Sequence, residues 1–187
     1  MPLALSVSAG EITVPRISPL PYEDRAASII NLDGNWAFCP APQASFPQTP
    51  AMANWKSIAV PGEWVMQGFK VEKGKSAGYE RHFSVPASWQ GKRIKLRFDA
   101  VYSECTVYVN GQEASSHFGG FTRFEIDITK LVKTGADNRL SLAVKSEGLA
   151  NSTSNASQYA YHALGGISRS VSLLALPEVN MAMLHVS

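Results

Sequence analysis

Apolar and polar residues alternate with a period of two along much of the chain, and this pattern predicts β-strands. The alternation is clearest over residues 92–98, 105–109, 123–128 and 140–144. Weaker runs lie near residues 35–38, 57–60, 79–85, 167–176 and 179–186. No segment keeps a helical period, and the best helical candidate is a short turn around residues 129–134. We therefore expect an all-β fold.

Turn-forming dipeptides separate the predicted strands. Asn110-Gly111 directly follows one of them and is the strongest short signal for a β-hairpin. Further reversals are predicted at residues 33–34, 61–62, 119–120 and 165–166. Many short strands with this spacing are typical of an antiparallel β-sandwich, here of roughly eight or nine strands.

Two predicted loops exceed the usual length of a structureless connection, about 12 to 15 residues. Residues 39–54 are rich in Pro and Ala, and residues 146–165 change from Ser and Asn to aromatic side chains. Because loops on a rigid sandwich often carry the binding residues, we expect a ligand to contact the second loop.

Aromatic side chains in loops and turns give the candidate ligand contacts, because a ring with a polar tip can cover the apolar face of a sugar. Other aromatic residues are expected in the core, namely Trp36, Phe83, Phe98 and Phe124. Glu104 joins the candidates as an acidic residue with an aromatic neighbour. The sugar-facing candidates are Tyr102, Tyr159, Tyr161, His162, Trp64 and Glu104.

Composition narrows the class of protein. The chain has 187 residues, of which 45% are hydrophobic, enough for one well-cored domain and too apolar for a disordered chain. A formal net charge of +2 offers little attraction for phosphate, so no nucleic-acid partner is expected. No apolar run approaches the length of about 18 residues that a membrane span needs. Cys39 and Cys105 form at most one disulfide or none.

Several motifs resemble catalytic or metal sites without their expected context. Residues 74–78 match G-x-S-x-G, but a nucleophile elbow needs a strand before the serine and a helix after it, whereas a strand is predicted next. The four histidines lie far apart, so neither a metal site nor a cofactor is predicted. No two carboxylates are placed together as glycoside hydrolysis requires.

The N-terminus carries an ambiguous signal. We expect residues 1–28 to form an extension, within which residues 1–9 have the apolar and small residues of a secretion-signal remnant. The basic segment that begins such signals is missing, so an ordinary apolar terminus is the alternative. We expect a periplasmic or extracellular protein on the first interpretation and a cytoplasmic protein on the second.

An ordered series of short phrases resembles a known family. They are LDGNWAF at 32–38, VPGEW at 60–64 with QGF at 67–69, GYERHFSVP at 78–86, FDAVY at 98–102, VYVNG at 107–111, HFGGFTRFEIDIT at 117–129, and GGISR at 165–169 with VSL at 171–173. In this order they resemble the N-terminal sugar-binding domain of family-2 glycoside hydrolases, which include β-galactosidases, β-glucuronidases and β-mannosidases. The resemblance covers about residues 29–177, and we expect the domain to span residues 29–187.

The resemblance implies a jelly-roll β-sandwich of the galactose-binding-domain type and places catalysis elsewhere. In the family, an immunoglobulin-like domain follows, then a (β/α)₈ barrel that carries both catalytic glutamates. The chain ends at Ser187, where the next domain would begin. We therefore expect a non-catalytic part of a retaining glycosidase that packs on the barrel and helps to shape the pocket for a β-glycoside. The alternative is a free-standing carbohydrate-binding module or lectin.

This sequence departs from the family pattern at two sugar contacts. In the bacterial β-galactosidases that it resembles, the loop after the strand matching residues 96–99 offers an asparagine to the sugar, and Tyr102 stands at that position here. A carboxylate of the later loop also contacts galactose there, and residues 159–160 provide none. The resemblance therefore does not imply galactose specificity, and we expect aromatic residues to form a sugar-facing wall of another shape.

Overall fold

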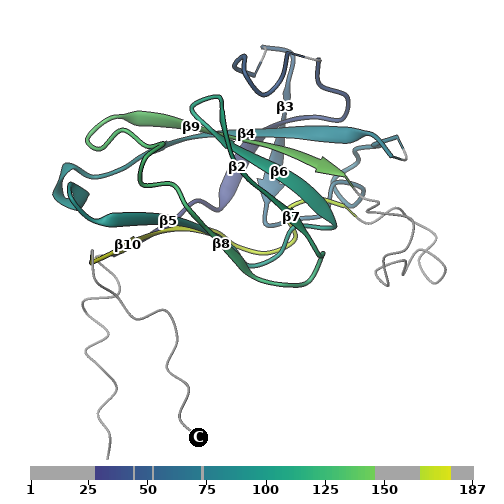
Figure 1. Cartoon of the computed structure of the whole chain (residues 1–187). Helices are drawn as coiled ribbons and strands as arrows, with labels where there is room; N and C mark the ends of the chain where they lie inside the picture. The colour runs from purple at the N-terminus through teal and green to yellow at the C-terminus, as the bar shows by residue number, and fades with distance from the viewer. Residues whose placement is uncertain (1–27, 44, 52, 73, 146–164, 178–187) are drawn as a thin grey trace, which may run out of the picture.

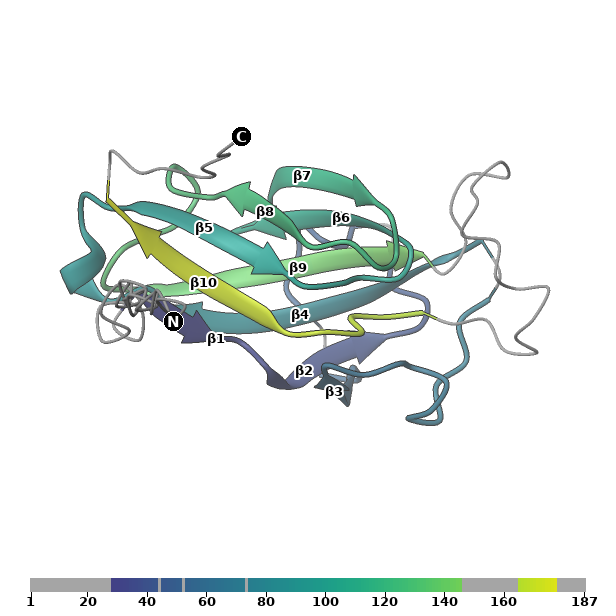
Figure 2. The same ribbon diagram turned by 90° about the horizontal axis from the view of Figure 1, so that it is seen from below.

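Two antiparallel β-sheets pack face to face in the computed structural model, which describes residues 28–43, 45–51, 53–72, 74–145 and 165–177 (Figure 1). The smaller sheet has the order β1 (Ile29–Asn31), β10 (Val171–Leu176), β5 (Arg93–Phe98), β8 (Phe124–Asp127). The larger sheet has the order β3 (Lys56–Val60), β2 (Gly34–Cys39), β4 (Ser76–Ser84), β9 (Asp137–Lys145), β6 (Glu104–Val109), β7 (Gln112–Phe118). Figure 2 views the molecule with the smaller sheet in front. The predicted all-β sandwich is confirmed.

The predicted strands that fall within the described residues, and the hairpin, correspond to observed elements, and three further elements were not predicted. Asn110 and Gly111 both have positive φ, 53° and 83°, and they connect β6 to β7 as the hairpin signal predicts. Strands β1 and β7 were not predicted, because β1 has only three residues and β7 is an edge strand without apolar alternation. A short 3₁₀ helix, η1 (Ala87–Trp89), was not predicted either. The predicted strand at residues 179–186 lies outside the described residues.

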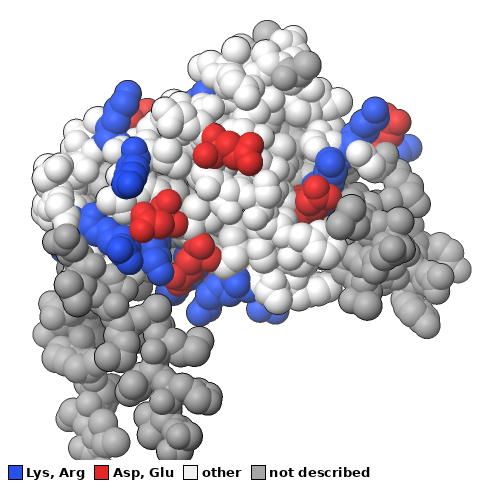
Figure 3. Space-filling model, in the orientation of Figure 1, with Lys and Arg blue, Asp and Glu red and all other residues white. Residues whose placement is uncertain are grey.

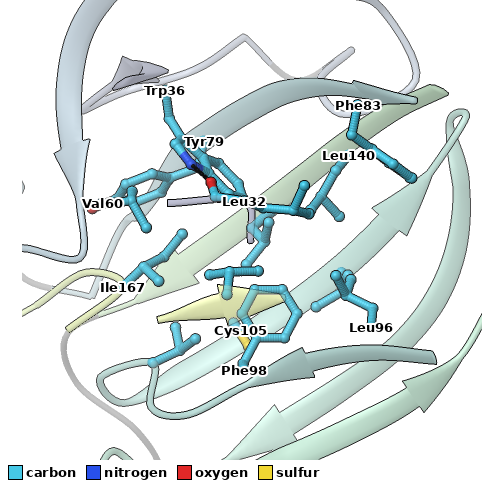
Figure 4. Close-up of a cluster of buried hydrophobic side chains, with 14 of the residues drawn as sticks. Leu32, Trp36, Val60, Tyr79, Phe83, Leu96, Phe98, Cys105, Leu140 and Ile167 are labelled. Atoms are coloured by element: carbon cyan, nitrogen blue, oxygen red, sulfur yellow. Dashed lines mark hydrogen bonds between the residues drawn. The ribbon is translucent and has the colours of Figure 1, made fainter. Parts of the chain in front are cut away.

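The alternating apolar side chains of both sheets fill the space between them (Figure 4). Trp36, Phe83 and Phe98 are buried as expected, with exposed fractions of 5% or less. Phe124 is partly buried at the edge of the core and stacks on Phe98 at a ring distance of 5.0 Å. The indole nitrogen of Trp36 donates a hydrogen bond to the Leu32 carbonyl at 2.9 Å, so this polar group is satisfied inside the core.

A buried amide joins the turn before β9 to the β6–β7 hairpin. The Asn138 side chain, 1% exposed, accepts hydrogen bonds from the Lys133 amide at 2.7 Å and from Asn110 Nδ2 at 2.9 Å. It also donates to the carbonyls of Lys133 and Ala136. These partners lie in turns, where backbone groups have no neighbouring strand to bond to. The Asn138 side chain supplies the hydrogen bonds that they would otherwise lack.

Replacing Asn138 by alanine should lower the free energy of unfolding by about 2–4 kcal/mol, because two or more buried polar groups lose their partner. Urea denaturation followed by tryptophan fluorescence measures this loss. Asn35→Ala, at an exposed position on β2, is the control and should change the midpoint little. A loss in Asn138→Ala no larger than in Asn35→Ala would contradict the prediction.

Residues 45–51 and 53–55, here called the covering segment, pack on the outer face of the larger sheet. The rings of Phe46 and Trp55 pack over Gly78 of β4, where a Cβ atom would lie 2.6 Å from Trp55 Cη2. Glu80 of β4 accepts a hydrogen bond from the Ala51 amide at 2.9 Å.

An ion pair continues this attachment beneath the covering segment. Arg139 Nη1 of β9 donates to Glu80 Oε2 at 3.1 Å, and Arg139 Nη2 donates to the Gln48 carbonyl at 2.9 Å. The Glu80 side chain is 4% exposed and the Arg139 side chain is 12% exposed. The Ser141 hydroxyl also donates a hydrogen bond to Glu80. A buried charge pair, a hydroxyl and two aromatic rings thus hold a loop that sequence composition alone predicted to be irregular.

The outer face of the smaller sheet carries a ladder of ion pairs along β5 and β8. Arg97 and Lys95 approach Glu125 at 2.7 Å and 3.1 Å, and Arg93 approaches Asp127 at 3.4 Å. Partial burial raises the pKa of Glu125, but hydrogen bonds and charge from Arg97 and Lys95 outweigh it, so the pKa is lowered from its ordinary value. Partial burial also raises the pKa of Asp127, but hydrogen bonds from Thr129 and the charges of Arg93 and Lys95 lower it by more. The pKa of Asp127 is therefore below its ordinary value as well.

This ladder predicts a loss of stability in acid. Carboxylates whose pKa is lower in the folded state stabilise the fold above their ordinary pKa, which is 4.5 for glutamate, and that contribution disappears as the pH falls through the lowered value. Glu125→Gln should therefore unfold more easily at pH 6, by about 0.5–1 kcal/mol, and its melting temperature should fall less between about pH 5 and pH 3. Glu72→Gln, at an exposed position, is the control. Equal acid sensitivity of Glu125→Gln and the unmodified chain would refute this.

Candidate functional site

Tyr102 lies at one end of the sandwich, in the connection between β5 and β6. The Tyr102 amide donates to the Gly166 carbonyl at 2.9 Å, and the Gly166 amide donates back to the Tyr102 carbonyl at 3.2 Å. The adjacent Ser103 amide donates to the Lys145 carbonyl at 2.9 Å. Lys145 and Gly166 flank the long loop predicted at residues 146–165, so the residues on either side of that loop both bond to the same dipeptide.

Two glycines allow close packing at this end. A Cβ atom at Gly165 would overlap the ring of Trp64, and one at Gly120 would overlap the ring of Tyr102. The Trp64 amide donates to the Gly165 carbonyl at 3.1 Å. Trp64 thus holds Gly165 in place through a backbone hydrogen bond and through its ring, which is 1% exposed.

The exposed aromatic surface at this end comes from two residues that were not predicted as ligand contacts, Phe121 and Phe118. Tyr102 is 8% exposed, and its ring meets the ring of Phe121 edge to face, with centroids 5.4 Å apart and planes at 65°. Phe121 is 64% exposed and Phe118, at the end of β7, is 45% exposed. The one signal in the sequence was an aromatic residue directly after the predicted Gly119-Gly120 turn.

A stacked histidine supports the loop that presents Phe121. The His117 ring lies parallel to Phe124 with centroids 3.8 Å apart. Its Nε2 is 3.2 Å from the Gly119 carbonyl and 3.3 Å from the Thr122 hydroxyl. These contacts hold both sides of the turn, so Phe121 projects from a supported loop.

Carboxylates at this end are mostly paired with cations. Glu104 lies 3.8 Å from Lys145, and Asp99 accepts a hydrogen bond from Arg123 at 2.6 Å. Glu63, next to Trp64, has one buried carboxylate oxygen without a hydrogen-bond partner. Among the described residues, this end therefore combines aromatic rings with carboxylates that are mostly ion-paired.

The buried thiol and the buried phenol of the core are both held in their protonated forms. Burial raises the pKa of the Cys105 thiol to about 12, so it stays protonated. Cys39 is also free, and the two cysteines form no disulfide. Burial likewise raises the pKa of the Tyr79 hydroxyl far above its ordinary value. Ser76 of the G-x-S-x-G match begins β4, so a strand follows the serine where a nucleophile elbow has a helix.

The structure brings part of the predicted site together. Tyr102 and Glu104 flank Ser103, and Trp64 lies beneath Gly165. Tyr159, Tyr161 and His162 lie outside the described residues. Within the described part of the chain, no group of three His, Cys, Asp or Glu side chains is placed to hold a metal ion. The same residues include no helix long and apolar enough to cross a membrane.

An antiparallel β-sandwich with exposed aromatic residues in the connections at one end is typical of ligand-binding β-domains. Residues 29–177 match the family model described as the sugar binding domain of family 2 glycosyl hydrolases. The chain belongs to this family.

Similar proteins carry two different activities in their names. The chain is 29% identical over 153 residues to a β-glucuronidase of Bacteroides fragilis, covering 80% of this chain and 21% of that protein. It is 34% identical over 104 residues to a β-galactosidase of Thermoanaerobacter pseudethanolicus, covering 55% and 14%. A solved β-glucuronidase of Ruminococcus gnavus in complex with uronic isofagomine superposes with a TM-score of 0.66 at 29% identity, covering 80% and 29%. The chain therefore spans about a fifth of the length of the curated relatives that it matches over most of its own length.

Proposed function

We propose that this chain is a non-catalytic domain of a retaining β-glycosidase, which packs on the catalytic barrel and shapes the rim of the sugar pocket in carbohydrate degradation. One observation carries the proposal. The backbone of Tyr102 and Ser103 bonds to Gly166 and Lys145, which flank the predicted loop that contains Tyr159, Tyr161 and His162. A sugar contacted by that loop would therefore also lie near Tyr102 and Phe121.

The chemistry of this end supports a positioning role. Aromatic rings bind the apolar faces of sugars, and two of the carboxylates at this end, Asp99 and Glu104, are paired with Arg123 and Lys145. The names of the relatives divide between glucuronides and galactosides, so the proposal extends to β-glycosides as a class.

Kinetics of the complete glycosidase test this proposal. Phe121→Ala should lower kcat/KM for an aryl β-glycoside about tenfold or more, mainly through KM, because it removes a binding surface rather than a reacting group. Tyr108→Ala, on the outer face of β6, is the aromatic control and should change kcat/KM little. The isolated chain should hydrolyse no chromogenic glycoside.

Two results would contradict the proposal. Hydrolysis by the isolated chain would show that catalysis resides in it. Unchanged kcat/KM in Phe121→Ala and in a Tyr159→Ala/Tyr161→Ala variant would show that this end does not serve the pocket. Calorimetric binding of a neutral glycoside by the isolated chain would instead favour a free-standing carbohydrate-binding module.

A further inference from the structure

A groove lies at the opposite end of β5 from Tyr102, with a volume of about 560 Å³. It is lined by the turn before β5 and the turn after β8, namely Gly91, Lys92, Arg93, Asp127, Thr129 and Lys130. Gly91 has a φ of +77° and no atom within 4 Å of the position of a Cβ, so the groove is open on that side.

The cations of this groove are only partly neutralised. Its single acidic residue, Asp127, is already engaged by Arg93 at 3.4 Å and by the Thr129 hydroxyl at 2.6 Å. Lys92 and Lys130 make no ion pair with any residue of the described chain. Two ammonium groups without an ion-pair partner among the described residues therefore border the groove.

The surrounding surface extends the positive charge along the sheet. The outer face of β5 and β8 with its adjoining turns holds six basic side chains, Lys92, Arg93, Lys95, Arg97, Arg123 and Lys130, and three acidic ones, Asp99, Glu125 and Asp127. Figure 3 shows blue and red side chains gathered at the lower left, over β5 and β8. This face carries a formal +3, whereas the whole chain carries +2, so the rest of the chain is slightly negative.

Acids interleaved with the cations restrict what this surface can bind. A nucleic acid presents a dense row of phosphates and favours a continuous positive surface, whereas the acids beside β5 would repel it. An acidic oligosaccharide presents separate carboxylates or sulfates between hydroxyl groups, which suits two free lysines beside a threonine and a paired arginine. The groove is of a size that accommodates small ligands.

We propose that this groove is a second saccharide site that binds an acidic glycan chain through Lys92 and Lys130, separate from the Tyr102 end. Strand β5 alone separates the two by roughly 17 Å, at about 3.3 Å per residue. A site at this distance would hold a distant part of a polymeric substrate and would not contact the reacting sugar.

Titration of the 187-residue chain with tetragalacturonate tests the site, with the uncharged maltotetraose as comparison. Tetragalacturonate should bind, maltotetraose should not, and affinity should fall at least about fivefold as NaCl rises from about 20 to about 300 mM. Lys92→Glu/Lys130→Glu should weaken binding about tenfold or more. Lys56→Glu/Lys75→Glu, an exposed pair outside the groove, makes the same change in net charge and should leave the affinity unchanged.

Any of three outcomes overturns the site. Equal losses in the two double variants would assign binding to net charge alone. Equal affinity for maltotetraose would remove the role of the carboxylates. Tighter binding of an oligothymidylate than of tetragalacturonate would mark a general polyanion surface. Circular dichroism of both variants confirms that each is folded, and neither test depends on activity at the Tyr102 end.

Discussion

Replacing Glu80 by alanine is expected to lower the free energy of unfolding by about 3–5 kcal/mol, because it leaves the charge of Arg139 buried without its partner. Arg139 is only 12% exposed and lies under the covering segment. The same substitution removes the acceptor of the Ala51 amide. Urea denaturation monitored by tryptophan fluorescence gives the midpoint and slope from which the loss follows.

The paired replacement separates charge from packing. Glu80→Leu/Arg139→Met removes both charges and keeps apolar volume, so it should be much more stable than Glu80→Ala. The Lys145→Met control removes one member of the partly exposed pair with Glu104 and should cost at most about 1 kcal/mol. If Glu80→Ala were no more destabilising than Lys145→Met, the buried pair would not be holding the covering segment.

Replacing Gly165 by alanine is expected to destabilise the chain by about 3 kcal/mol, because the added methyl group overlaps the Trp64 ring. The ring is 1% exposed and belongs to the hydrophobic core, so it cannot move aside without displacing other core residues. Thermal and urea denaturation both measure the effect. The nearby Ser168→Ala is exposed and should stay within about 0.5 kcal/mol of the unmodified chain.

A second substitution tests the cause of this loss. Trp64→Leu also costs stability because it removes a buried ring, but it leaves room for the new methyl group. The loss of unfolding free energy in the double variant Gly165→Ala/Trp64→Leu should therefore be smaller than the sum of the losses in the two single variants. Simple additivity would show that the overlap is not the source of the loss.

Much of the sandwich was predictable because its strands bury one face. Leu96 and Phe98 alternate with Lys95 and Arg97, and that alternation directly reflects a core on one side and solvent on the other. Strand β7 lacks the signal because it lies at the edge of the larger sheet with both faces partly exposed. Where burial does not alternate, sequence periodicity carries no information.

The site was predictable only in part, because a position in a turn does not determine the direction of a side chain. Trp64 and Phe121 both lie in turns beside glycine-containing segments, yet Trp64 is 1% exposed and Phe121 is 64% exposed. The difference comes from long-range packing of Gly165 on Trp64 and Gly120 on Tyr102. Glu80 was unpredictable for the same reason, since its partners Arg139 and Ala51 belong to segments distant in the sequence.

The backbone bonds at Tyr102 and Ser103 also bear on how such a domain diversifies. When one dipeptide fixes the exit and the return of an insertion, evolution can lengthen or rewrite that insertion while the host sheets keep their register. Each doubling of length costs only about 0.6 kcal/mol of closure entropy. One scaffold can thus acquire new substrate preferences through a single replaceable segment.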